Sequence, residues 1–184
     1  MAQPVIEGGT GTRSWSTEEG AKLTERTKPS VKVREPLLSE ILTKAHKGKI
    51  KDDKVAILKE ENCRALQQIC QWAYNPKIKS MLPEGTPPYM ENDAPEGTEH
   101  MLLRTEGDKL WHFVSTDGKP ANPNLQATQR ERMFIRLLEG LHKDEAELLI
   151  NVKEKRLHQV YKGVSSEVVK EAFNWDENFK VKGV

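Results

Sequence analysis

The chain has 184 residues, of which 36 % are hydrophobic and 31 % charged, and its formal net charge is +1. This length suits one domain with a core plus a terminal extension, and the small net charge argues against a strong overall field for nucleic acid or an anionic membrane. No apolar run approaches the roughly 20 residues that span a bilayer, and the first residues lack a signal-peptide pattern, so we expect a cytosolic protein without a membrane partner.

Residues 1–35 are predicted to form a flexible N-terminal arm. They are rich in Gly, Thr, Ser, Glu and Lys and show no sustained hydrophobic period. The stretch GGTGT at 8–12 lacks both the preceding strand and the following Gly-Lys-Ser/Thr of a phosphate-binding loop. Trp15 is a large aromatic side chain in this arm, and we expect it to contact a partner. Residues 36–184 are expected to form a helical domain.

Three helices are predicted between residues 36 and 75. Pro36 suits the first position of one helix and Gly48 its end. The second covers 51–61 and has an Asp as its expected cap. The third begins at Asn62 and ends at Asn75, before a proline, and one further helical turn is expected up to Leu82. Both cysteines face inward on this third helix, where a separation of seven residues places their Cα atoms about 10.5 Å apart, too far for a disulfide.

An acidic loop is predicted at residues 83–98. The motif PEGT occurs at both of its ends, and Tyr89 lies between them. A structured loop of this length is uncommon and is often functional. We therefore interpret the segment as a partner-binding loop, with Tyr89 as its anchor and carboxylates at Glu84, Glu91, Asp93, Glu96 and Glu99.

The rest of the chain is also predicted to be helical. The segment 100–119 fits either a helix interrupted at Gly107 or a pair of short strands, and helix is favoured. The clearest helix ends near Gly140, which is expected to adopt the left-handed conformation. His142 is predicted to cap the next helix and Ser165 the last one. The expected fold class is all-α: an irregular bundle of seven to nine short helices with an extended N-terminal arm.

The sequence offers no clear catalytic or metal-binding motif. The five histidines form no HxH, HExxH or His-Cys set, and no Ser or Cys lies in a nucleophile elbow. Glu139, His142 and Glu145 are close in sequence, but the expected helix break at Gly140 removes the spacing that would bring them together. We therefore expect no enzyme activity, no metal and no cofactor.

A nucleic-acid surface is a further interpretation. A helix-turn-helix built from 143–152 and 165–173 would need a connection much longer than the usual three or four residues. A basic set near the first of these helices could instead neutralise phosphates, although a solvated face explains the same charges. Its members are Lys153, Lys155, Arg156, Tyr161 and Lys162.

Several segments carry a family resemblance, among them MLPEGTPPY, DAPEGTEHMLLR and RERMFIRLLEGLHKDEAELLINVKEKRL. Over about residues 36–175 the chain resembles a family of small uncharacterised proteins of T-even-like myophages that infect marine bacteria and cyanobacteria. The resemblance implies a phage-encoded protein that acts in the infected host cytoplasm or is packed in the virion. The resemblance does not assign a function to any residue of this chain.

The favoured hypothesis is a non-enzymatic phage accessory protein that binds a phage or host macromolecule through its arm and acidic loop. One alternative is a virion component, such as an internal, neck or minor capsid protein. The other is a nucleic-acid-binding protein of phage replication or transcription. The sequence makes no prediction of oligomeric state.

Overall fold

The computed structural model describes residues 34–95 and 100–183. The predicted arm therefore lies almost wholly outside the described residues, and so do Trp15, Glu96 and Glu99. In the described part, no helix is both long enough and apolar enough to cross a membrane.

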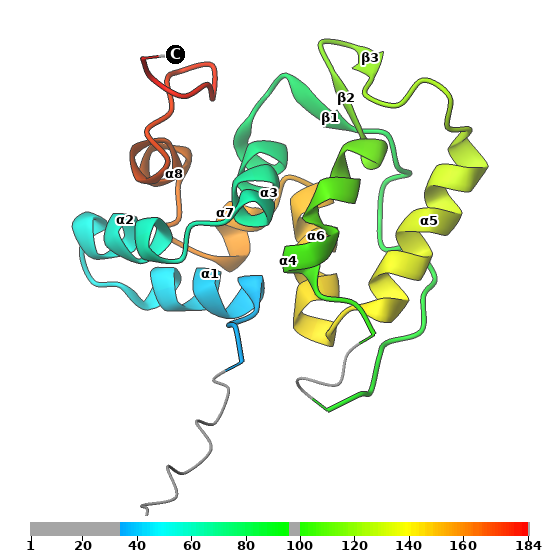
Figure 1. Cartoon of the computed structure of the whole chain (residues 1–184), viewed down its shortest axis with the longest axis horizontal. Helices are drawn as coiled ribbons and strands as arrows, with labels where there is room; N and C mark the ends of the chain where they lie inside the picture. Colours follow the sequence, from blue (N-terminus) through cyan, green and yellow to red (C-terminus); the bar gives the residue numbers. More distant parts are fainter. Residues whose placement is uncertain (1–33, 96–99, 184) are drawn as a thin grey trace, which may run out of the picture. The chain divides into compact units, whose positions relative to one another are not determined.

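The first three helices are α1 (Leu38–Lys47), α2 (Lys51–Glu60) and α3 (Arg64–Tyr74), close to the predicted positions (Figure 1). α1 begins two residues after Pro36, where the Glu40 carboxylate accepts the backbone N–H of Leu37 at 2.8 Å. The N-cap of α3 is Cys63 rather than the expected Asn62, and its sulfur accepts the N–H of Leu66 at 3.5 Å.

The expectation of a purely all-α fold is wrong, because a small antiparallel sheet follows α3. Its strands are β1 (Ile78–Ser80), β2 (Val114–Thr116) and β3 (Lys119–Pro120), in the order β1-β2-β3. β1 occupies the segment for which a helical turn was expected. β2 and β3 are joined by Asp117 and Gly118, which both have positive φ, 51° and 78°. This is the geometry of a two-residue hairpin turn, and it fixes the register that pairs Thr116 with Lys119.

The segment between the acidic loop and this hairpin combines both interpretations made from sequence. α4 (Leu103–Glu106) continues directly into a 3₁₀ helix, η1 (Gly107–Phe113), and the chain then enters β2. Gly107 has ordinary helical φ and ψ, so no strained backbone requires a glycine there. A Cβ at this position would lie 2.5 Å from the Cβ of Ala65, so the glycine allows η1 to approach α3 closely.

The remaining helices are α5 (Ala127–Gly140), α6 (Lys143–Lys153), α7 (Leu157–Val160) and α8 (Ser166–Ala172). The caps predicted for α6 and α8 are confirmed: His142 accepts the N–H of Asp144 at 3.2 Å, and Ser165 accepts that of Val168 at 3.4 Å. The Asp cap expected for α2 is wrong, because the N-cap of this helix is Ile50. The left-handed stop expected at Gly140 is wrong, because this residue is the last of α5 and lacks positive φ. A Cβ there would lie 2.8 Å from the Met101 sulfur, so close packing explains the glycine.

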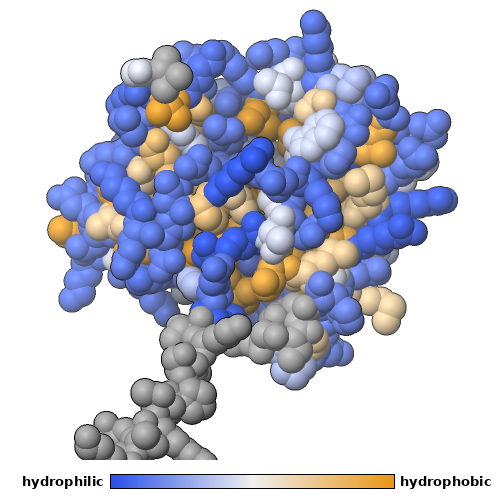
Figure 2. All heavy atoms as spheres, viewed as in Figure 1, coloured by the Kyte–Doolittle hydropathy of each residue, from blue (hydrophilic) through white to orange (hydrophobic). Residues whose placement is uncertain are grey.

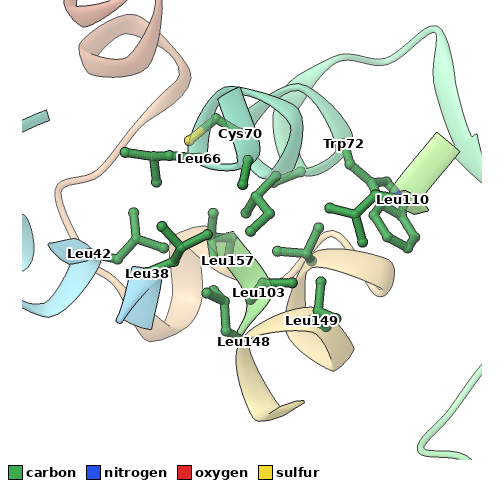
Figure 3. Packing of buried hydrophobic residues seen from close by; sticks show 14 of the residues in the cluster. Leu38, Leu42, Leu66, Cys70, Trp72, Leu103, Leu110, Leu148, Leu149 and Leu157 are labelled. Carbon is green, nitrogen blue, oxygen red and sulfur yellow. The ribbon is translucent and has the colours of Figure 1, made fainter. Parts of the chain in front are cut away.

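One hydrophobic core joins these helices (Figure 3). Leucines from α1, α3, α4, α6 and α7 meet beside Cys70 and Trp72 of α3. The aromatic residues after α8 fold back onto the domain. Trp175 and Phe179 are buried in the core, and Trp175 forms a β-bridge with Val181.

A buried carboxylate links three helices within this core. Glu145, in the first turn of α6, is only 1 % exposed. Its carboxylate accepts the N–H of Leu38, the first residue of α1, at 3.0 Å, and that of Leu103, the first residue of α4, at 2.9 Å. The first turn of a helix has N–H groups without intrahelical partners and a partial positive charge, so an anion is stabilising there.

Candidate functional site

The acidic loop follows a fixed course along α5 and α6, although residues 83–95 contain no helix or strand (Figure 1). Lys153, the last residue of α6, and Glu154, which follows it, hold the first turn of the acidic loop. The Lys153 ammonium donates to the carbonyl of Pro83 at 2.7 Å, and the Gly85 N–H donates to the Glu154 carboxylate at 2.9 Å. Lys153 also contacts Glu154 directly, and this hydrogen bond lowers the pKa of Glu154.

Further contacts hold the second half of the loop. The Met90 N–H donates to the Glu139 carboxylate at 3.4 Å, and the Asn92 amide donates to the carbonyl of Gly140 at 3.5 Å. Glu91 forms an ion pair with Lys143 at 3.0 Å. The loop is therefore tied to α5 and α6 at several points along its length.

The side chains of the loop differ in exposure. Tyr89, the predicted anchor, is half-buried and packs against the core, and this burial raises the pKa of its hydroxyl. Met90 is 80 % exposed, the most exposed large hydrophobic residue in the described part of the chain. Glu84, Glu91 and Asp93 are exposed as well. The loop thus presents carboxylates around a prominent apolar side chain.

A cavity of about 270 Å³ lies between the first half of the loop and α5. Its walls are mainly apolar, and Glu84 and Glu131 supply carboxylates to its lining. Neither carboxylate forms a salt bridge within residues 34–95 and 100–183. Apolar residues that line it include Leu82, Pro83, Pro87, Pro88, Phe134 and Ile135.

The structure does not bring the predicted basic set together as one solvent-facing patch. Lys153 is only 5 % exposed, and its ammonium is engaged by the loop. The Lys155 ammonium donates to the carbonyls of Trp72 and of Asn75, the latter at 3.0 Å. Tyr161 is buried. Lys162 and Arg156 are exposed, and Arg156 borders a hollow shared with the acidic loop.

The charged residues considered for catalysis have separate partners. Glu139 accepts from the loop, His142 caps α6, and Glu145 lies in the core. Among residues 34–95 and 100–183, no group of three or more His, Cys, Asp or Glu has the arrangement of a metal site. Both cysteines are free thiols, and burial raises the pKa of Cys70, which keeps this thiol protonated.

Sequence reasoning missed the role of Lys153 and Glu154 in fixing the loop. It placed Lys153 on a basic surface and gave Glu154 no role. A local signal was present, because Lys153 follows Leu149, Ile150 and Val152 on the inner side of α6, where a charged group requires a partner. The identity of that partner, about 70 residues earlier in the chain, was not visible in the pattern.

Residues 41–159 match the model of a protein family described as a family of unknown function, DUF6433. The chain belongs to this family. The DUF6433 match begins within α1 and ends within α7, so it contains the acidic loop together with Lys153 and Glu154. The expectation of an uncharacterised family is thereby confirmed, whereas the phage origin stays a prediction. Comparisons with curated proteins and with solved structures gave no match.

Proposed function

We propose that this protein is a non-enzymatic accessory protein of a bacteriophage that binds a phage or host protein through its acidic loop. In this proposal it acts in the cytoplasm of the infected host, and the N-terminal arm with Trp15 supplies a second contact. The phage assignment rests on the resemblance of the sequence described above.

The observation that carries the proposal is the combination of a fixed loop backbone with outward-facing side chains. Pro83, Gly85 and Met90 are held through their backbone atoms by side chains of α5 and α6. A loop already ordered before binding loses less conformational entropy when a partner arrives, which favours affinity. The ordering of the acidic loop therefore suits a surface that binds a partner.

The chemistry of the loop favours a basic partner with an apolar pocket. Carboxylates at Glu84, Glu91 and Asp93 would attract Lys and Arg side chains and speed association at low salt. Met90 is flexible and polarizable, and it would fill an apolar pocket on the partner. The cavity beneath the loop would accept an apolar side chain of the partner in return.

Affinity capture from phage-infected cells tests this proposal. The recognition variant combines Met90→Ala, Glu84→Gln and Asp93→Asn, which alter exposed side chains and leave the contacts of Lys153 and Glu154 intact. The matched control combines Val181→Ala, Glu60→Gln and Glu167→Gln, all exposed and located on α2, α8 and the C-terminal segment. We expect the control to retain the partners of the wild-type protein and the recognition variant to lose them.

Equal capture by both variants would remove the loop as the binding site. Mass spectrometry of purified virions supplies a separate outcome. Detection of the protein there at a constant copy number would place it in the particle, as an internal, neck or minor capsid component. Loss of capture after nuclease treatment would mean that the partner is a nucleic acid and not a protein.

A further inference from the structure

The cavity beneath the acidic loop combines apolar walls with acidic residues from two different elements. Glu131 of α5 lines it together with Phe134 and Ile135, which follow three and four positions later and therefore lie on the same face of the helix. Glu84 lines it from the loop, next to Pro83. The helix wall and the loop wall of the cavity thus each include one glutamate.

Both glutamates are available to a molecule that enters the cavity. Glu84 is exposed and Glu131 is half-buried, so neither side chain is enclosed by the protein. In the part of the chain that the structure describes, neither forms a salt bridge. Lys153 also belongs to the lining, but its ammonium is bonded to Pro83 and to the Glu154 carboxylate, which balances its charge. The cavity therefore favours a cation.

The size and the walls of the cavity narrow the choice of this cation. Its volume of about 270 Å³ is below the roughly 300–1,000 Å³ typical of pockets for drug-sized molecules, so it suits one long side chain rather than a whole ligand. The occupant must pack on apolar walls and carry a positive charge at the same time. Lysine and arginine meet both conditions, because their aliphatic stem covers apolar surface while the charged group stays accessible.

We propose that this cavity binds one arginine side chain of the partner protein. The aliphatic stem packs against Ile135 and the prolines of the loop, and the guanidinium lies between Glu84 and Glu131. Arginine suits the site better than lysine because its planar group carries several N–H donors and can bond two carboxylates on different edges at once. It is also the more weakly hydrated cation, so it loses less solvation on entering a cavity.

This inference rests on the proposed function and specifies the chemistry of its partner. The apolar contact inside the cavity is made by the arginine stem, while Met90 makes its own contact outside. Hydrophilic residues cover most of the face shown in Figure 2, and apolar residues lie scattered among them. A basic segment with an arginine anchor matches such a surface, since arginine brings charge and apolar area in one side chain.

Nuclear magnetic resonance titration of the full-length ¹⁵N-labelled chain tests the site. The probe is the capped peptide acetyl-Gly-Arg-Gly-amide at millimolar concentration, compared with peptides in which lysine or citrulline replaces the arginine. We expect the arginine peptide to shift the amide resonances of Gly85 and Ile135 and to leave that of Val181, on the C-terminal segment, in place. The citrulline peptide has nearly the same shape without the charge, so it should bind about tenfold more weakly or worse.

The variant Glu131→Gln removes the carboxylate of the helix wall and keeps the size of the side chain. We expect it to weaken binding of the arginine peptide by about tenfold, the effect of losing a hydrogen bond to a charged group. Glu167→Gln removes an exposed carboxylate from α8 instead and should bind the peptide as the wild type does. Thermal unfolding checks that both variants are folded.

The inference is overturned if the arginine peptide shifts neither amide, if the lysine or citrulline peptide binds as tightly, or if folded Glu131→Gln binds as Glu167→Gln does. These results are distinct from failure of the proposed function. Without peptide binding, a recognition variant that still loses its partner would keep the loop as a binding surface and remove the arginine site alone. Equal capture by the recognition variant and its control would remove the loop from partner binding even if the peptide binds.

Discussion

Several charged side chains of this protein satisfy backbone groups at the ends of helices. Glu145 accepts from the first residues of α1 and α4. Lysines serve the C-terminal ends of helices in the same way. The Lys54 ammonium donates to three carbonyls at the end of α1, and the Lys155 ammonium donates to two carbonyls at the end of α3. Arg130, buried on α5, donates to the carbonyls of His112 and Leu125. Charge thus serves the architecture at these positions.

Glu145→Gln should destabilise the fold by about 1–3 kcal/mol, because the amide replaces one of two acceptor oxygens with a donor that faces a backbone N–H. The free energy of unfolding from chemical denaturation measures this effect. Glu147→Gln on the exposed side of the same helix is the matched control, and it should change stability by less than about 0.5 kcal/mol. Equal effects of the two substitutions would mean that Glu145 does not hold the two helices.

Lys155 gives stability a measurable pH dependence. Burial lowers its pKa from 10.5 to about 8. Between these values the unfolded chain retains a proton that the folded chain has released, so raising the pH favours the folded state. Compared with Lys155→Met, the wild-type protein should gain free energy of unfolding between about pH 8 and about pH 10.5. Denaturation of both proteins across this range checks the prediction, and parallel curves would contradict it.

At the residue scale, the sequence predicted the local caps of α6 and α8, misplaced those of α2 and α3, and missed the distant ones. His142 and Ser165 act within their own helices, so a short window shows both the cap and its target. Glu145 lies in the first turn of its own helix, but its acceptor role involves N–H groups 42 and 107 residues away. No hydrophobic period reveals such a partner.

At the scale of elements, the contact between α3 and η1 depends on Gly107. Gly107→Ala should destabilise the fold by about 1–3 kcal/mol, because the new methyl group would overlap Ala65. Ala65→Gly alone should cost about 1 kcal/mol through helix propensity. The double variant should be less destabilised than the sum of the two, since the second glycine restores the space. Thermal or chemical unfolding of all three variants measures this coupling, and strict additivity would contradict it.

The attachment of the acidic loop to α6 is testable by hydrogen exchange. Lys153→Met keeps the length of the side chain and removes its bond to Pro83 and its contact with Glu154. We expect exchange of the Gly85 amide to accelerate by about tenfold, the effect of losing a hydrogen bond to a charged group. The Met90 amide, held by Glu139 instead, is the internal control. Unchanged exchange at Gly85 would show that Lys153 does not fix the loop.

The longer elements were predictable and the short ones were not. α1, α3, α5 and α6 each have ten or more residues, enough for the helical period to appear. The strands have two or three residues, too few for an alternating pattern. The hairpin nevertheless left a signal in Asp117-Gly118, the pair typical of a tight β-turn. An alternative pair of strands was considered for this region, but β1 lies before the loop, and its pairing with β2 is a long-range contact.

For the whole molecule, the acidic composition of residues 83–98 indicated a recognition loop before its course was known. The sequence could not show that this loop is ordered by α5 and α6, because its partners lie about 50 to 70 residues later in the chain. The structure also shifts the emphasis within the loop. Tyr89 packs inward as part of the scaffold, whereas Met90 and the neighbouring carboxylates face solvent.

Site-specific photo-crosslinking in infected cells tests the loop as the binding surface most directly. A photoreactive residue is placed at position 90, which is exposed on the loop, and in a second protein at position 181, which is exposed on the C-terminal segment. We predict that position 90 forms a crosslink to a defined protein and that position 181 does not. A crosslink of equal yield at both positions, or none at position 90 while the partner is still captured, would contradict the account.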